Sequence, residues 1–433
     1  MNLGRKSSVL TALFLWALLL TPTLRALAQA GRKNPPPQPA ASPGNADTQP
    51  AYVPDPNRDE YKLVFPKGYG NSLDLTTVPK ILLGKKAREQ DAERGWKDYQ
   101  YSFIDQINEA GAQGYRLVSL ALYPKMAILR RDQIQHEYEM FETISPHYFS
   151  DAEFERKYAP LARKGFRVDE CFYLWGGCDT PRRSRVEQCE YRRFFVVERE
   201  RHVRTANEFE VLTPHLSFNA KKIETELTEQ ISTAVKSGLS PTHMITRFEV
   251  LVQSAAGRDD SATTGYELQV AAGNLKRVNE LAQQGYRLML RPYEFEVAVM
   301  YRKMGQGTPV SYARIREKKL EQELPRLQKQ GAIYRMTYGC HGIWNGTMIF
   351  EQPSVSDGKQ LEYRVLTLEL QRVENVAEQK VEFQLTPASK ETMETLNRLA
   401  KEGFEVRDLF ACDMSDYEKK GLSRVKILLE RVE

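Results

Sequence analysis

The sequence repeats one short phrase along most of its length, and this repetition constrains the fold more than any other feature. The phrase reads as the end of a helix, a glycine, an aromatic or aliphatic residue and then a strand. Three copies are clear, namely NEAGAQGYRL at 108–117, NELAQQGYRL at 279–288 and NRLAKEGFEV at 397–406. Weaker copies lie at 160–168, 234–239 and 327–332. The repetition predicts a series of small, similar folding units.

One glycine anchors each copy at the point where a helix is expected to end. Many helices end on a residue in the left-handed conformation, which glycine adopts without the strain that a Cβ would bring. Apolar residues at helical spacing precede the glycine, as Val278, Leu281 and Ala282 do ahead of Gly285. The six predicted helix ends lie at Gly114, Gly165, Gly238, Gly285, Gly331 and Gly403.

Strand patterns flank each predicted helix. Alternating runs that start with Tyr or Phe come before it, and two runs, the second ending in charged residues, come after it. This order predicts an α+β fold made of six βαββ modules with antiparallel sheets. The third module is expected to be degenerate, with one long strand over Thr242–Gln253 in place of a hairpin. The expected module boundaries are 59–135, 136–205, 206–257, 258–305, 306–360 and 361–433.

The spacing of the glycines suggests a higher order of repetition. Glycines three copies apart are separated by 171, 166 and 165 residues, which indicates a block of three modules that was duplicated. One helix over three strands buries too little apolar surface to be stable alone, so the modules should pack on one another. We therefore expect two blocks of three, joined through shared or facing sheets, with a boundary near Gly257–Gly265.

The recurring pattern resembles a small bacterial module of about fifty residues that is classed as a domain of unknown function. The shared features are Tyr-x-Val or Tyr-x-Leu, then Leu-Asn-x-Leu-Ala-x-x-Gly-aromatic, then a strand ending in Lys or Arg. The resemblance implies six divergent copies. It implies no activity that could be carried over to a residue, because the shared positions are core and cap positions.

The first residues have the features of a secretory signal. Arg5 and Lys6 are followed by the apolar run Val9–Leu20 and by small residues at Ala28–Ala30, so residues 1–30 are predicted to be cleaved. A retained membrane anchor is the alternative, but the run is shorter than the roughly 20 residues that span a bilayer. Residues 31–58 are proline-rich and predict a disordered tether. We expect a periplasmic or secreted bacterial protein with no transmembrane span after cleavage.

The cysteines permit a disulfide in such an oxidising compartment. Cys178 and Cys189 bracket the predicted hairpin loop of the second module and are expected to face each other. Cys171 could compete as a partner, and two free thiols are the alternative. The pairing of Cys340 and Cys412 stays open. The five cysteines leave at least one thiol over.

The motifs of common enzymes do not occur in the sequence. Its six histidines form no metal-binding spacing, and it contains neither a phosphate-binding loop nor a nucleophile elbow. We therefore predict no catalytic residue, no metal and no cofactor. The chain has 62 lysines and arginines against 57 acidic residues, a weak excess for a nucleic-acid binder, so no nucleic-acid partner is expected.

One local charge feature stands out between Arg182 and Arg204, where eight arginines face four glutamates. Arg182, Arg183 and Arg185 could bind an anionic glycan or lipid headgroup through their planar guanidinium groups. A solvated strand face with cross-strand Arg–Glu pairs is the favoured interpretation. The first functional hypothesis is a non-enzymatic interaction scaffold of the cell envelope that binds a protein or another envelope component. The alternative is the anionic-ligand binder, and an enzyme is less favoured.

Overall fold

The computed structural model describes the greater part of the chain beyond residue 59. The described residues are 60–65, 69–70, 103–122, 125–145, 152–179, 188–215, 219–246, 248–254, 266–290, 297–304, 307–338, 346–354, 361–375, 380–410 and 422–432. The predicted signal at 1–30 and the tether at 31–58 lie outside them. No helix among the described residues is long and apolar enough to cross a membrane.

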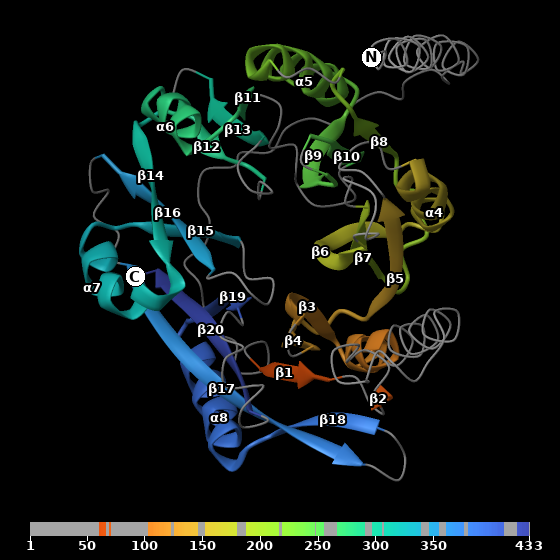
Figure 1. Ribbon diagram of the computed structural model, residues 1–433, viewed down its shortest axis with the longest axis vertical. Helices are drawn as coiled ribbons and strands as arrows, with labels where there is room; N and C mark the ends of the chain where they lie inside the picture. Colours follow the sequence, from red (N-terminus) through yellow and green to blue (C-terminus); the bar gives the residue numbers. More distant parts are fainter. Residues whose placement is uncertain are drawn as a thin grey trace, which may run out of the picture. The chain divides into compact units, whose positions relative to one another are not determined.

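The described chain runs through the order strand, helix, strand, strand six times, and we number the resulting units 1 to 6 (Figure 1). Unit 1 has β1 (Tyr61–Val64), a helix over 103–112, β3 (Tyr115–Leu122) and β4 (Lys125–Arg131). Unit 2 has β5 (His136–Ser145), α4 (Ala152–Ala162), β6 (Arg167–Asp179) and β7 (Gln188–Glu200). Unit 3 has β8 (Phe209–Leu212), α5 (Ala220–Lys236), β9 (Leu239–Met244) and β10 (Val250–Ser254).

The second half of the chain follows the same order, with additions in units 5 and 6. Unit 4 has β11 (Tyr266–Ala272), α6 (Leu275–Gln283), β12 (Arg287–Leu288) and β13 (Val297–Lys303). Unit 5 has β14 (Val310–Arg316), the 3₁₀ turn η3 (Glu317–Lys319), α7 (Leu320–Lys329), β15 (Ile333–Tyr338) and β16 (Thr347–Pro353). Unit 6 has β17 (Leu361–Asn375), an extra strand β18 (Lys380–Leu385), α8 (Pro387–Lys401), β19 (Glu405–Phe410) and β20 (Leu422–Val432).

Each unit forms its own antiparallel sheet, in which the last strand lies between the first strand and the strand that follows the helix. The sheet of unit 6 is larger because β18 extends it and the short strand β2 (Tyr69–Gly70) pairs with β18. This mixture of helices and antiparallel sheets confirms the α+β class. Among the described strands, those of neighbouring units are not combined into shared sheets, apart from the pairing of β2 with β18.

The six predicted helix ends are confirmed by the backbone. All six glycines have positive φ, between 62° at Gly331 and 92° at Gly403. At Gly285 there is a second constraint, since a Cβ there would lie 2.6 Å from the Cα of Gly307. The last helix begins at a residue suited to a helix start, because the Thr386 side chain accepts a hydrogen bond from the Ser389 N–H and Pro387 follows it.

The prediction of one long strand in the third module is wrong. The chain turns between β9 and β10, which pair as a hairpin. Thr246 explains the turn, because its hydroxyl accepts hydrogen bonds from the N–H groups of Phe248 and Glu249 at 3.2 and 3.0 Å. A threonine that bonds its neighbouring backbone in this way reverses the chain without the glycine or proline that marks most turns.

The structure explains two features of the repeated phrase. The aromatic residue after the glycine packs against an arginine at the end of the central strand. The ring-to-guanidinium distances are 4.4 Å for Phe166 and Arg199, 4.5 Å for Tyr286 and Arg302, and 4.9 Å for Phe404 and Arg431. Such cation–π contacts join the residue after the glycine to the charged end of the central strand within one sheet.

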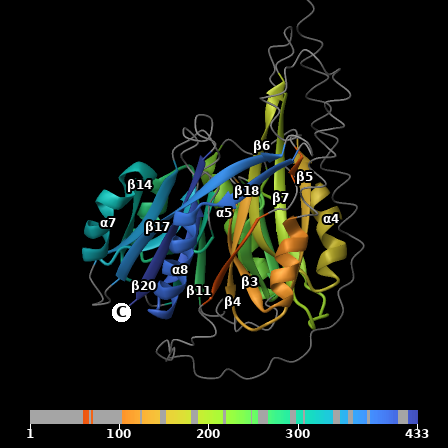
Figure 2. The same ribbon diagram turned by 90° about the horizontal axis from the view of Figure 1, so that it is seen from below.

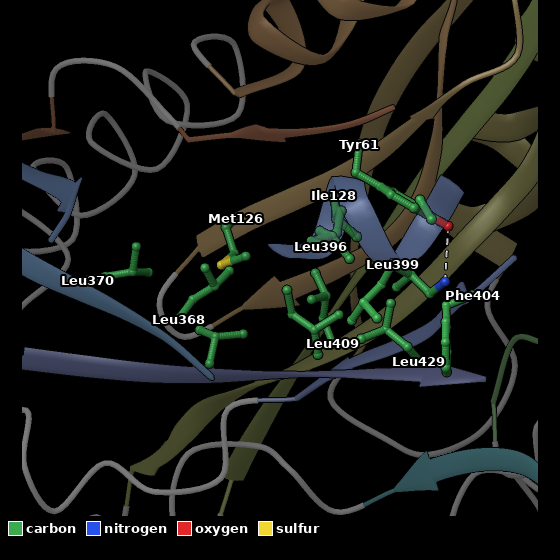
Figure 3. Close-up of a cluster of buried hydrophobic side chains, with 14 residues drawn as sticks. Tyr61, Met126, Ile128, Leu368, Leu370, Leu396, Leu399, Phe404, Leu409 and Leu429 are labelled. Carbon is green, nitrogen blue, oxygen red and sulfur yellow. Dashed lines mark hydrogen bonds between the residues drawn. The ribbon is translucent and has the colours of Figure 1, made fainter. Parts of the chain in front are cut away.

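Both faces of each central strand are buried. In β4, Met126 and Ile128 belong to one apolar cluster, and the alternate residues Ala127 and Leu129 belong to the next. Alternate side chains of a strand point to opposite faces, so each sheet packs against two neighbours. Figure 3 shows one such cluster, in which Tyr61, Met126 and Ile128 of unit 1 meet leucines of unit 6.

Six clusters of this kind link the units in a closed cycle. Five of them join consecutive units, and the sixth joins unit 6 back to unit 1. Units 3 and 4 share a cluster in the same way as the others, through residues such as Leu227 and Val270. The expected division into two blocks of three is therefore not found in these contacts. The facing surfaces are a helix and sheet of one unit against the sheet of the next.

Candidate functional site: polar contacts between neighbouring units

One tyrosine position on the first strand links a unit to the unit before it. The hydroxyl groups of four tyrosines accept hydrogen bonds from backbone N–H groups of the preceding unit, three residues after its glycine. The bonds join Tyr138 to Leu117 (2.9 Å), Tyr312 to Leu288 (2.7 Å), Tyr363 to Tyr334 (2.8 Å) and Tyr61 to Val406 (3.0 Å). In units 1, 5 and 6 the strand register shifts just after the donor residue, so the tyrosine satisfies an N–H at a β-bulge.

The two remaining units depart from this arrangement in a way that the backbone explains. Unit 3 has Phe209 at the tyrosine position, and Gln253 instead accepts from the Val168 N–H at 3.2 Å. Unit 4 has Leu268 there, and the residue three positions after the glycine of unit 3 is Pro241, which has no N–H that would need an acceptor. An acceptor, either the tyrosine or Gln253, thus occurs wherever the residue three positions after the glycine has an N–H.

Beside the tyrosine, the central strand carries a buried carboxylate in units 2, 5 and 6. The register pairs Tyr138 with Glu198, Tyr312 with Glu351 and Tyr363 with Glu430. Tyr312 and Tyr363 donate to their carboxylates at 2.9 and 2.8 Å. Burial, followed by the nearby carboxylate, raises the pKa of all three phenols, which therefore stay neutral at pH 7.

Arginines from the second strands neutralise these carboxylates. Arg116 of unit 1 lies 3.1 Å from Glu198, and Arg287 of unit 4 lies 2.7 Å from Glu351. Both arginines come two residues after the glycine of their unit. At the junction of units 6 and 1 the charges are exchanged, since Glu405 occupies that position and lies 3.0 Å from Arg130. A buried charge is tolerated only when it is paired in this way.

His136 belongs to the Glu198 cluster and is only 3% exposed. Its Nδ1 atom lies 3.0 Å from Glu198 and its Nε2 atom 2.8 Å from Asp132. Burial disfavours the charged imidazole, but the hydrogen bonds to Asp132 and Glu198 outweigh burial and raise the pKa of His136 to about 9. Burial also opposes ionisation of Glu198, yet His136 and Arg116 lower its pKa. The pair is therefore charged at neutral pH.

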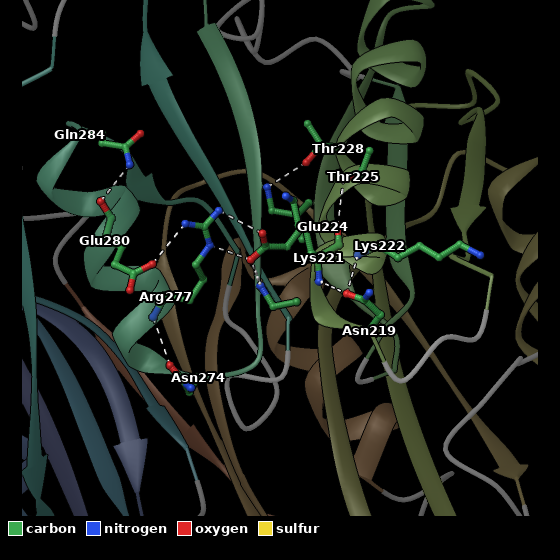
Figure 4. Close-up of polar contacts among 12 residues, drawn as sticks. Asn219, Lys221, Lys222, Glu224, Thr225, Thr228, Asn274, Arg277, Glu280 and Gln284 are labelled. Atoms are coloured by element: carbon green, nitrogen blue, oxygen red, sulfur yellow. Dashed lines mark hydrogen bonds and ion pairs between the residues drawn. The ribbon is translucent and has the colours of Figure 1, made fainter.

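Two more polar networks join units 2, 3 and 4. In the first, the Gln253 Oε1 atom accepts from Tyr158, from the Val168 N–H and from Asn207. In the second, Arg277 of α6 makes two hydrogen bonds to Glu224 of α5, at 2.9 and 3.0 Å (Figure 4).

These polar groups form structural contacts between units. Their hydrogen bonds connect one unit to the next, and the pKa shifts hold His136 charged and the tyrosines neutral. A catalytic acid or base needs a pKa near the working pH. Among the described residues, no group of three or more His, Cys, Asp and Glu side chains could hold a metal ion.

The residues that sequence analysis singled out fall mostly beyond the described side chains. Arg182, Arg183 and Arg185 lie outside the described residues, as do Cys340 and Cys412. The expected facing of Cys178 and Cys189 is seen in the backbone, where the two are register partners in β6 and β7. Their side chains, like that of Cys171, lie outside the described part, so the disulfide stays a prediction. Within the same arginine-rich stretch, Arg199 forms an expected cross-strand ion pair with Glu137.

Sequence analysis did not assign a role to the tyrosines and carboxylates between units. The signal was present, because four of the six first strands carry a tyrosine at one position. It was interpreted as a strand signal alone. No family model matches the sequence, and no curated protein and no solved structure matches it either.

Proposed function

We propose that the protein is a non-enzymatic interaction scaffold, exported to the bacterial cell envelope, and that its six units are tandem divergent copies of one βαββ module. The observation that carries the proposal is that recurring polar residues of the described units contact neighbouring units. The repeated positions therefore support assembly of the scaffold. Repeat proteins of this kind bind partners through surfaces that differ from unit to unit.

The resemblance to a small bacterial module of unknown function supports the same proposal. If the units are copies of such a module, partner binding depends on the parts that differ among the copies and not on the shared phrase. In unit 2, the part that differs most from the other copies is the pair of last strands, β6 and β7. β5 ends where Ser145 pairs with Tyr191, but β6 and β7 continue to pair until Asp179 and Gln188. This hairpin therefore extends past its neighbouring edge strand, as Figure 2 shows.

The extended hairpin supports a second candidate function, the binding of an anionic glycan or lipid. In the sequence, Arg182, Arg183 and Arg185 lie between its two strands, and their guanidinium groups would bind the anionic ligand. Electrostatic binding of this kind weakens as salt increases. Either function could use the same hairpin as a contact.

One experiment separates the two candidates. The wild-type protein and a variant with Arg182, Arg183 and Arg185 replaced by Ala would be passed over an anionic lipid column and used as bait in a crosslinked envelope extract. The scaffold proposal expects specific partners for both proteins. Salt-dependent retention of the wild type alone would favour the anionic binder. Recovery of nothing above background in either assay would contradict both.

A further inference from the structure

The junction of units 4 and 5 has an unbalanced buried charge. Two guanidinium groups, Arg287 on β12 and Arg335 on β15, contact the single carboxylate of Glu351 on β16. Arg287 Nη1 lies 2.7 Å from Oε1, and Arg335 Nη2 lies 2.7 Å from Oε2. Glu351 is 2% exposed, so the charges meet where water screens them poorly.

The corresponding clusters of units 2 and 6 have no excess of positive charge among the described residues. Around Glu198, the two positive charges of Arg116 and His136 meet three carboxylates, because Asp169 and Asp132 contact them as well. Arg407 contacts Glu430 in unit 6 and also lies 3.4 Å from Glu405. In the described part of the chain, Arg287 and Arg335 make ion pairs with no carboxylate other than Glu351. Among the described residues, the junction of units 4 and 5 therefore has one positive charge in excess.

The two guanidinium groups retain unused donors that are partly accessible. Their side chains are 23% and 28% exposed. Each guanidinium carries five N–H donors. Glu351 receives one hydrogen bond from Arg287 and two from Arg335, so most donors are not engaged by described residues.

A tyrosine hydroxyl completes the surroundings. Tyr312 donates to Glu351 at 2.9 Å, which occupies the carboxylate further and leaves the arginines less fully neutralised. Tyr301, the register partner of Arg287, packs against the apolar cluster shared by units 3 and 4. Burial opposes the charge of Arg335, but Glu351, Tyr312 and Tyr301 together raise the pKa of its guanidinium.

We propose that Arg287 and Arg335 bind one small oxyanion, a carboxylate or a phosphate group. A planar guanidinium matches such a group through two parallel hydrogen bonds. One bound anion with a single negative charge would balance the excess charge at this junction. The site is separate from Arg182, Arg183 and Arg185 and does not depend on the scaffold function.

Calorimetric titration of the full chain at low ionic strength tests the site, with acetate and inorganic phosphate as separate probes and chloride as the reference ion. The proposal expects at least one of the two anions to bind saturably, with one anion per chain. Titration up to an anion concentration of about 10 mM detects even a dissociation constant in the millimolar range. The probe that binds more tightly identifies the class of anion. Absence of saturable binding by both probes would overturn the proposal.

Variants locate the binding. Arg335→Gln leaves Glu351 paired with Arg287 and Tyr312, so the fold is retained, and it should weaken binding at least tenfold. Arg287→Lys keeps the charge but removes the planar fork, and it should weaken binding in a folded protein as well. The matched control is Arg407→Gln, which removes the equivalent arginine of unit 6 and should leave the affinity unchanged. The assignment would be refuted if Arg335→Gln and Arg407→Gln lost the same amount of binding affinity. It would also be refuted if neither Arg335→Gln nor Arg287→Lys lost any.

Discussion

Replacing Tyr312 with Phe tests whether the tyrosine hydroxyls stabilise the junctions between units. The substitution removes one oxygen atom and leaves the ring in place. It deprives the Leu288 N–H of its acceptor at 2.7 Å and Glu351 of a donor at 2.9 Å. Tyr312 is 4% exposed, so water cannot easily replace the hydroxyl.

The expected cost follows from these two contacts. A buried donor left unsatisfied costs about 1–3 kcal/mol, and a hydrogen bond to a charged group contributes about 1.5–3 kcal/mol. The two terms share one hydroxyl and do not add fully, so we expect Tyr312→Phe to lower the free energy of unfolding by about 2–4 kcal/mol. Urea denaturation followed by circular dichroism measures this loss.

Tyr266→Phe provides the matched control. Tyr266 lies on the first strand of unit 4, and its ring packs against Tyr301 at 5.5 Å. Among the described residues, none forms a hydrogen bond with the Tyr266 hydroxyl, so its removal should change stability by less than about 0.5 kcal/mol. The reasoning fails if Tyr312→Phe and Tyr266→Phe have the same small effect.

Three further substitutions probe other junctions. Gln253→Leu removes the acceptor of two hydrogen bonds from unit 2 and of a third from Asn207, and it should lower the free energy of unfolding by about 2–4 kcal/mol in the same denaturation assay. His136 contributes stability that is complete below its unfolded pKa of about 6.5 and is lost as the pH rises through about 9, up to about 3 kcal/mol, and His136→Gln should flatten this pH dependence. Glu405→Arg places like charges beside Arg130 and should cost about 1 kcal/mol, which Arg130→Glu in the same chain should restore.

Each of these predictions has a contradicting result. Gln253→Leu with wild-type stability would show that its amide is not needed at the junction. An unchanged slope of stability between pH 7 and about 10 in His136→Gln would assign that slope to other groups. Additive losses in the doubly substituted protein would show that Arg130 and Glu405 do not interact.

Local patterns predicted the elements well because local forces determine them. A glycine at a helix end reports a backbone conformation that few other residues adopt, and all six predicted positions have it. The turn at Thr246 was missed because its signal is one hydroxyl bonded to nearby N–H groups, within a run of strand-forming residues. Periodicity does not distinguish such a run from a continuous strand.

Contacts between units were beyond the reach of such patterns. A continuous apolar run predicts that a strand is covered on both faces, but it does not say which unit covers it. The link between unit 6 and unit 1 joins residues more than 270 positions apart, such as Arg130 and Glu405. The roles of the first-strand tyrosines depend on a β-bulge in a different unit. The expected division into two blocks was drawn from spacing along the chain, which does not predict these contacts, and it is not found among the described clusters.

The most direct test of the closed cycle of contacts is a zero-length crosslink between units 1 and 6. Arg130 Nη1 lies 3.0 Å from Glu405 Oε1. In the Arg130→Lys variant, carbodiimide should couple the side chain at position 130 to Glu405 within a single chain, as detected by mass spectrometry of the monomer. Lys426 and Glu321, 3.1 Å apart, provide an internal control between units 6 and 5. The account predicts that both crosslinks form within the monomer. It would be contradicted if the control crosslink formed without the crosslink between positions 130 and 405, or if the crosslink between positions 130 and 405 formed only in dimers.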